Sequence, residues 1–161
     1  MKLRLISILL FISIIAASAK PCFTAFNKKD YYAVMATQNL DAVNNELIIV
    51  QGSSMPEKDA YEGTLLMTKA GLVNNISEKI SLFKSGHRKL ESCIKANAQN
   101  AELRLLRLMI QENAPPIVNY RGDMKEDKTF IESSFKTLPA DIQQYIRDYS
   151  KRSKILNPKD F

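Results

Sequence analysis

Apolar residues recur at spacings of three and four through almost the whole chain after residue 20, and extended runs in which apolar and polar residues alternate are missing. Positions three and four apart share one face of an α-helix, so this pattern predicts amphipathic helices. The clearest stripe comprises Ile80, Phe83, His87, Leu90 and Ile94. We therefore predict an all-α fold.

Capping residues, glycines and prolines divide the pattern into about seven helices. Asn100 and Ser77 are placed to cap two of them, and the spacing of Ser54 to Glu57 predicts a capping box at a third. Asp123 and Glu126 have the same spacing at a fourth helix. The short links predict antiparallel hairpins, arranged as a compact bundle or as a short tetratricopeptide-like stack. The predicted helices cover about residues 28–37, 40–50, 54–73, 77–97, 100–114 and 123–138, and a seventh begins at residue 139.

Two places in this pattern call for a special arrangement. Gly86 lies in the middle of its predicted helix, where glycine is less favourable than alanine, so we expect a close packing contact or a bend there. The two prolines at 115–116 predict an extended turn after the fifth helix. We expect Ile117, Val118 and Tyr120 to fold this turn onto the core.

The N-terminus has the layout of a secretory signal. Lys2 and Arg4 precede an apolar run over residues 5–17, and the small residues Ala17 and Ala19 stand where a signal peptidase recognises its substrate. We predict a signal peptide at 1–19, cleaved after Ala19, and a periplasmic or secreted protein. The apolar run is shorter than the roughly 20 residues that cross a bilayer, so we expect no stable membrane insertion after cleavage.

The rest of the chain is long enough for one core. We predict a single helical domain over residues 20–156 and a frayed C-terminal tail over residues 157–161. Cys22 and Cys93 are the two cysteines, and an oxidising compartment would allow them to form a disulfide. The alternative is two unpaired thiols, with Cys93 as a small buried residue on a helix.

Charge narrows the classes of partner. The formal net charge of the protein is +6, and the basic residues are spread along the chain rather than gathered in one block. Arg147, Lys151 and Lys154 would form a basic face on the last helix, which is usually a solvated surface. Because no basic motif interleaved with aromatic residues occurs, we expect no nucleic-acid partner.

Residue patterns that carry catalysis are missing. The sequence contains no nucleophile elbow, no phosphate-binding glycine loop and no His-Glu-x-x-His or Cys-x-x-Cys spacing. His87 is the only histidine, and its place on the apolar stripe is typical of a packed or half-buried side chain. We expect no catalytic site, no metal site and no cofactor.

One polar cluster stands out on the fifth and sixth predicted helices. It comprises Glu102, Arg104, Arg107, Gln111, Tyr120 and Asp127. Arginines three apart share a helix face and can bind a carboxylate or phosphate, so the cluster could be an anion site. Alternatively, a carboxylate of the chain itself, Asp127 or Glu102, already pairs with the arginines, and Tyr120 completes a structural network.

Two resemblances bear on the fold. The junction from Leu90 to Leu106 is similar to the step between two tetratricopeptide repeats, although the Trp-Leu-Gly-Tyr part of that pattern is missing. The region from Asp59 to about Ile131 resembles a group of small secreted bacterial helical proteins without assigned function. The resemblance implies export and a helical fold, and it implies no chemistry. The matching positions are 59–63, 66–72, 102–107, 111, 114–115, 120 and 127–128.

These observations favour a non-enzymatic module that binds another protein or organises an envelope complex. The alternative is a binder of small anions that uses Arg104 and Arg107 beside the proline turn. A third class, an enzyme built from carboxylates such as Glu102 and Asp127, would require these side chains to meet in one site.

Overall fold

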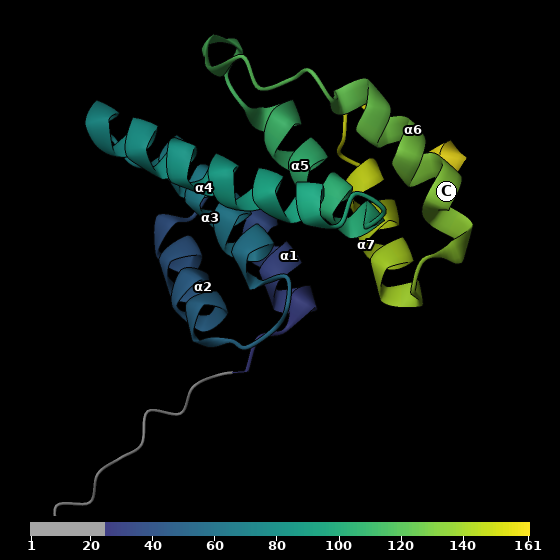
Figure 1. Cartoon of the computed structure of the whole chain (residues 1–161), viewed down its shortest axis with the longest axis horizontal. Coiled ribbons are helices and arrows are strands. Elements are labelled where there is room, and N and C mark those ends of the chain that lie inside the picture. Colours follow the sequence, from purple (N-terminus) through teal and green to yellow (C-terminus); the bar gives the residue numbers. More distant parts are fainter. Residues whose placement is uncertain (1–24) are drawn as a thin grey trace, which may run out of the picture.

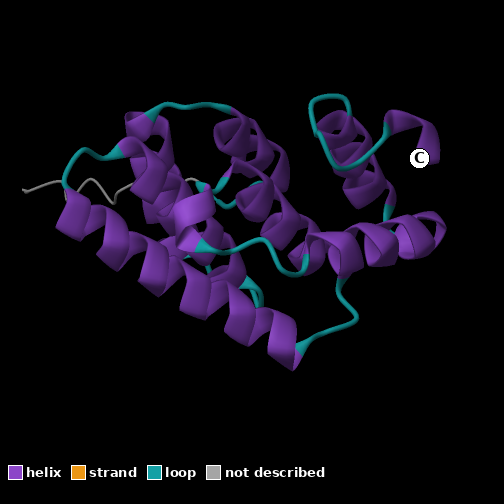
Figure 2. Cartoon of the chain, turned by 90° about the horizontal axis from the view of Figure 1, so that it is seen from above, coloured by secondary structure: helices purple, strands orange, loops and turns teal. Residues whose placement is uncertain are grey.

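The fold is all-α, as the sequence predicts. The computed structural model describes residues 25–161, so the predicted signal peptide at 1–19 and Cys22 lie outside the described residues. Within them the helices are joined by short loops, with no strand (Figures 1 and 2). The α-helices are α1 (Lys28–Ala36), α2 (Leu40–Gly52), α3 (Lys58–Leu72), α4 (Ile76–Ala96), α5 (Ala101–Asn113), α6 (Met124–Ser134) and α7 (Ala140–Ser150). Three 3-10 helices follow α5, α6 and α7, namely η1 (Pro116–Val118), η2 (Phe135–Thr137) and η3 (Pro158–Asp160).

Asparagine side chains cap the N-termini of four of the α-helices. The side chains of Asn27, Asn39, Asn75 and Asn100 accept hydrogen bonds from backbone N–H groups in the first turns of α1, α2, α4 and α5. Asn100 is therefore the cap that the sequence predicts. The predicted cap Ser77 is wrong, because Asn75 caps α4 two residues earlier and places Ser77 inside the helix.

The two predicted capping boxes do not form. Glu57 occupies the N-cap position of α3 without a side-chain capping bond, because Ser54 lies too far before the helix. Asp123 precedes α6 and makes no capping bond either. Its carboxylate instead accepts a hydrogen bond from Gln111 Nε2 at 3.1 Å. The side chain of Asp123 thus bonds to Gln111 of α5 instead of to the backbone of the helix that it precedes.

Helix α5 is the centre of the structure. Every residue of 101–111 is buried, and the helix contacts α3, α4 and α6. A helix covered on all sides is usually apolar throughout. This one carries Glu102, Arg104, Arg107 and Gln111, so each of these polar groups needs a partner from a neighbouring helix. The compact arrangement around α5 is the first of the two predicted alternatives.

Helices α3 and α4 make the closest approach between two helices. Gly63 of α3 and Gly86 of α4 face each other, and a Cβ added at Gly63 would lie 2.6 Å from the backbone oxygen of Gly86. Glycine at both positions lets the two backbones touch. The close packing contact predicted at Gly86 is confirmed.

Of the C-terminal residues 157–161, predicted to fray, residues 157–160 are exposed and Phe161 packs against the domain. Leu156 is buried, and the ring of Phe161 packs edge-on against Phe135 with centroids 5.0 Å apart. Arg147 Nε donates a hydrogen bond to the backbone oxygen of Phe161 at 3.2 Å. These contacts hold the tail on α7 and η2.

Among residues 25–161, no helix has both the length and the apolarity that crossing a membrane requires.

Substituting Gly63 by alanine should destabilise the protein by about 1–3 kcal/mol, because the new methyl group meets backbone that cannot move away. Chemical denaturation measures the change in the free energy of unfolding. Gly71, also in α3, is the matched control, since an added Cβ there has nothing within 4 Å. Gly71→Ala should stabilise by about 0.5–1 kcal/mol. Two changes of the same sign and size would contradict the close approach.

Candidate functional site

The polar cluster predicted from the sequence divides into two sites on opposite sides of α5. Arg104, Arg107 and Gln111 bond to α6 and to the segment just before it. Glu102 instead bonds to α1 and α3. The sequence placed these residues in one cluster, but residue 102 lies too far round the helix to reach the arginines' carboxylate partners.

Asp127 of α6 is the centre of the first site. Its side chain is fully buried. Arg107 binds both oxygens, with Nε 2.7 Å from Oδ2 and Nη2 2.7 Å from Oδ1. This two-point geometry matches a planar guanidinium to a planar carboxylate and holds both in one orientation.

Arg104 binds the same carboxylate from one turn away. Its Nη1 lies 3.0 Å from Asp127 Oδ1 and 2.8 Å from Glu126 Oε1, and its Nε donates to the backbone oxygen of Ala98 at 3.2 Å. The guanidinium also lies over the ring of Phe130, 4.6 Å from its centroid. Arg104 is therefore bound through its Nε and Nη1 atoms and through one face of its guanidinium group.

Burial alone would lower the pKa of Arg107, but its hydrogen bonds to Asp127 and the nearby carboxylates of Glu91 and Asp123 outweigh burial and raise the pKa above its ordinary value. The same balance, with Glu126 in addition to Asp127, raises the pKa of Arg104. Both arginines stay charged, and each charge has a carboxylate partner.

Tyr120 extends the network to α4. Its hydroxyl donates to Glu91 Oε1, and Glu91 Oε2 accepts from Arg107 Nη1 at 3.1 Å. Burial, and then the hydrogen bond to Glu91, raise the pKa of Tyr120, so the phenol stays protonated. The ring of His87, which is half-buried as predicted, lies edge-on to Tyr120 at 4.7 Å. The network thus joins α4, α5 and α6.

This geometry supports the structural alternative for the arginines. A bound anion would have to displace Asp127 from a fully buried position, and nothing else in the described network could then neutralise that carboxylate. Asp127 is the partner that the sequence proposed, and Tyr120 completes the network through Glu91. The suggestion that Glu102 pairs with these arginines is wrong.

Glu102 has its own set of partners. It accepts hydrogen bonds from Lys28 Nζ at 2.7 Å, Tyr61 hydroxyl at 2.6 Å and Tyr32 hydroxyl at 3.2 Å. Burial, and then the charge of Glu102, raise the pKa of Tyr61 and of Tyr32. The sequence analysis did not identify Tyr32 and Tyr61 as partners of Glu102, because helical spacing gives no indication of where a hydroxyl group points.

Replacing Asp127 by asparagine should destabilise the protein by about 3–5 kcal/mol, because Arg104 and Arg107 lose the buried charge that neutralises them. Glu126→Gln is the matched control, since its side chain is 68% exposed and also pairs with Arg104. It should cost less than about 1 kcal/mol. Chemical denaturation of both variants measures the difference. Equal losses would show that Asp127 is not the central partner.

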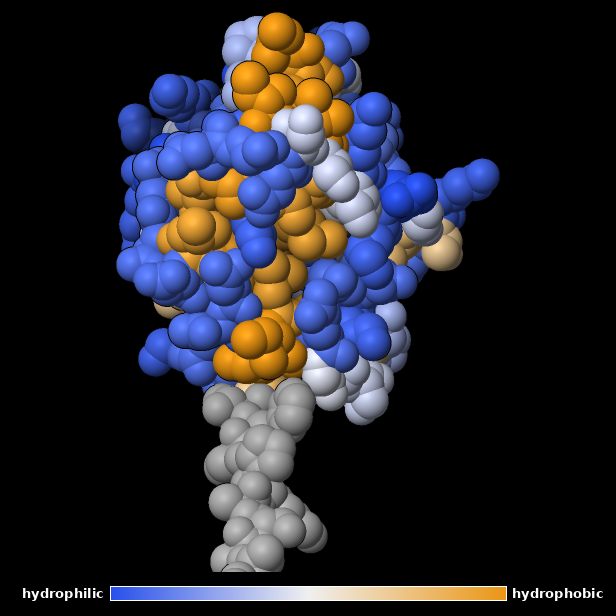
Figure 3. Space-filling model, turned by 90° about the vertical axis from the view of Figure 1, so that its left-hand side faces the viewer, coloured by the Kyte–Doolittle hydropathy of each residue, from blue (hydrophilic) through white to orange (hydrophobic). Residues whose placement is uncertain are grey.

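A large groove opens on another side of the domain. It has a volume of about 1140 Å³ and is lined by the ends of α1, α3, α5 and α7, the N-terminal half of α4 and the turn η1. Its rim carries the most exposed large apolar side chains of the described residues apart from Ile48, namely Ile76 (73%), Ile80 (50%), Ile117 (91%) and Val118 (37%). Figure 3, which views the end of the molecule where α4 begins, shows apolar surface in a band with polar surface on both sides.

The groove exists because the apolar stripe of α4 is longer than the surface that covers it. Leu90 and Ile94 are buried, Phe83 and His87 are half-buried, and Ile80 is exposed. The stripe predicted from the sequence is therefore covered only in its C-terminal part. The turn after α5 continues the exposed apolar surface.

The expectation for that turn is partly wrong. Tyr120 is buried as predicted, but Ile117 and Val118 point away from the core. The prolines start the 3-10 helix η1, and Asn119 ends it in the left-handed conformation with φ 47°. This short turn directs its apolar side chains into the groove rim.

Basic side chains line both sides of the groove. Lys79 and Lys84 come from α4, and Arg152 and Lys154 follow α7. The one carboxylate in the lining, Glu112, already accepts hydrogen bonds from Tyr149, Ser153 and the backbone N–H of Lys154.

The basic face predicted at Arg147, Lys151 and Lys154 does not form. Helix α7 ends at Ser150, so Lys154 is no longer on the helix. Arg147 turns to the ring of Phe135, 4.8 Å from its centroid, and Lys151 pairs with Asp148 at 2.7 Å.

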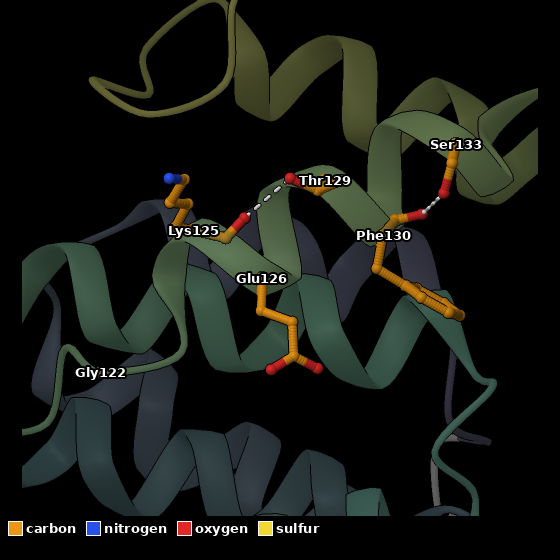
Figure 4. Close-up of a pocket in the computed structure, with 6 residues that line it drawn as sticks. All are labelled: Gly122, Lys125, Glu126, Thr129, Phe130 and Ser133. Atoms are coloured by element: carbon orange, nitrogen blue, oxygen red, sulfur yellow. Dashed lines mark hydrogen bonds between the residues drawn. The ribbon is translucent and has the colours of Figure 1, made fainter.

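A second, shallower depression lies on the outer side of α6 (Figure 4). Apart from the amine of Lys125, its polar side chains bond within the helix or to the core. Thr129 donates to the backbone oxygen of Lys125, and Ser133 donates to that of Phe130 (Figure 4). Glu126 accepts a hydrogen bond from Arg104. These bonds leave no convergent set of groups for a ligand.

Over residues 25–161, no group of three or more histidine, cysteine, aspartate or glutamate side chains is placed to bind a metal ion. Cys93 is half-buried, and burial raises the pKa of its thiol. The disulfide with Cys22 stays a prediction. Comparisons with protein-family models, with curated proteins and with solved structures found no match.

Proposed function

We propose that this protein is a non-enzymatic binding module whose groove accepts an apolar segment of a partner protein. The observation that carries the proposal is the row of exposed apolar side chains on the two sides of the groove, contributed by α4 and by η1. Exposed apolar residues gathered around a concave surface are typical of interaction sites. Scattered single exposed residues, such as Ile48 on α2, need no such explanation.

The polar sites support a non-enzymatic role. Their charged groups are paired with one another and join helices, as Asp127 does with Arg104 and Arg107. An anion binder at Arg104 and Arg107 has less support, because Asp127 and Glu126 occupy those guanidinium groups. Among the described residues, exposed large apolar side chains gather around the groove without a partner inside the domain.

The size of the groove favours a protein segment over a small molecule. Small-molecule pockets are usually about 300–1,000 Å³ and bury most of the ligand. This groove lies just above that range, at about 1140 Å³, and its exposed isoleucines lie on the rim. A small ligand inside would leave Ile76 and Ile117 in water, whereas a polypeptide laid along the groove would cover them.

Selection from a displayed peptide library with the full chain as bait tests this function. Enriched peptides should carry apolar residues at helical spacing, and Ile80→Asp should weaken their binding at least about tenfold, because burial of an isoleucine contributes about 1.5–3 kcal/mol.

The control is Ile48→Asp, which changes an isoleucine that is 58% exposed on α2, outside the groove. It should leave binding unchanged. Peptides that bind the Ile80 variant as tightly as the unaltered protein would show that the groove is not the binding surface.

A further inference from the structure

The charges around the groove indicate which charge a partner segment should carry. We infer that the groove recognises an amphipathic helix with acidic residues beside its apolar face, an inference that rests on the proposed function. Four cations line the groove against the single carboxylate of Glu112. An apolar segment flanked by glutamate or aspartate would complement both the apolar floor and the basic sides.

The four cations have no carboxylate partner among residues 25–161. Within residues 25–161, no carboxylate oxygen lies within 4.0 Å of Lys79, Lys84, Arg152 or Lys154, whereas Lys89 and Lys151 elsewhere on α4 and after α7 are paired with nearby aspartates. Arg152 lies against the ring of Tyr149, 5.3 Å from its centroid. Glu112 is held by Tyr149 and Ser153 and so does not neutralise the lysines of α4.

The positions of the charges fit a helix. On α4, Ile76, Ile80, Phe83 and His87 follow helical spacing on the groove side, and Lys79 and Lys84 lie beside them. The distance from Ile76 to His87 is about 16 Å at the rise of an α-helix, which is about three turns. A helix of that length could place one row of apolar residues on this stripe and carry acidic residues on each side, toward α4 and toward Arg152 and Lys154.

Two matched peptides of about 18 residues test the inference. Both carry the same leucines at helical spacing, and their flanking positions are glutamate in one peptide and lysine in the other. Fluorescence anisotropy with the full chain measures the two dissociation constants. We expect the acidic peptide to bind at least about tenfold more tightly at low salt, and the difference to shrink at about 1 M salt, because the pairs are exposed.

A charge-reversed variant assigns the effect to the groove. The double substitution Lys79→Glu and Lys84→Glu should abolish the preference for the acidic peptide or reverse it. Arg88→Glu with Lys95→Glu is the matched control, since both residues are exposed on α4 and neither lines the groove. The control should keep the preference.

The outcomes separate this inference from the proposed function. If both peptides bind equally and Ile80→Asp weakens both, the acidic partner is overturned while the groove remains a binding site. If neither peptide binds, or Ile80→Asp has no effect, both are overturned.

Two further measurements test the other occupants of the groove. Sodium laurate that binds more tightly than the acidic peptide would assign the groove to a small amphiphile and overturn the inference. A dimer in sedimentation that Ile80→Asp makes monomeric would assign it to a second copy of the chain, with the same consequence. Weak laurate binding and a monomeric protein would support the acidic helix.

Discussion

The pairing of Asp127 with Arg104 and Arg107 is the interaction on which the C-terminal half of the fold depends. Helix α5 is buried over residues 101–111, so the side chains of Arg104 and Arg107 are only 10% and 7% exposed. An ion pair in a protein interior adds little net stability compared with apolar packing, but removing one partner leaves a buried charge. Asp127 is therefore required once the arginines are buried. Its two-point contact with Arg107 fixes the position of α6 on α5.

On the opposite side of α5, a second buried charge, that of Glu102, also has partners from neighbouring helices. Glu102 is held by Lys28 and by the hydroxyl groups of Tyr32 and Tyr61, which belong to α1 and α3. The charges of α5 thus hold the N-terminal helices on one side and the C-terminal helices on the other. Because each contact has a defined geometry, α5 specifies the arrangement of its neighbours as well as their burial.

Local signals in the sequence predicted the helices well, and long-range contacts decided the rest. Apolar periodicity predicted seven helices, the residue type of Asn100 predicted a cap, and the mid-helix Gly86 predicted a close contact. Each of these features depends on residues close in sequence or on a single steric requirement. Asp127 was identified, with Glu102, as a candidate partner of the arginines because both carboxylates lie close to them in the sequence. The tyrosine partners of Glu102 were missed, since the pattern of apolar positions carries no information about how a helix is rotated toward a residue 41 or 70 positions away.

The groove is where the periodic pattern and the structure diverge, and this difference is itself informative. A stripe at regular helical spacing normally means buried surface, yet the first part of the α4 stripe stays exposed because α4 extends beyond the helices that cover its C-terminal part. The prolines after α5 add Ile117 and Val118 to the same exposed surface instead of covering it. These exposed side chains contribute nothing to folding, because only burial removes apolar surface from water. We therefore propose that a partner covers the part of the α4 stripe that the fold leaves exposed, and that the lysines beside it favour an acidic partner.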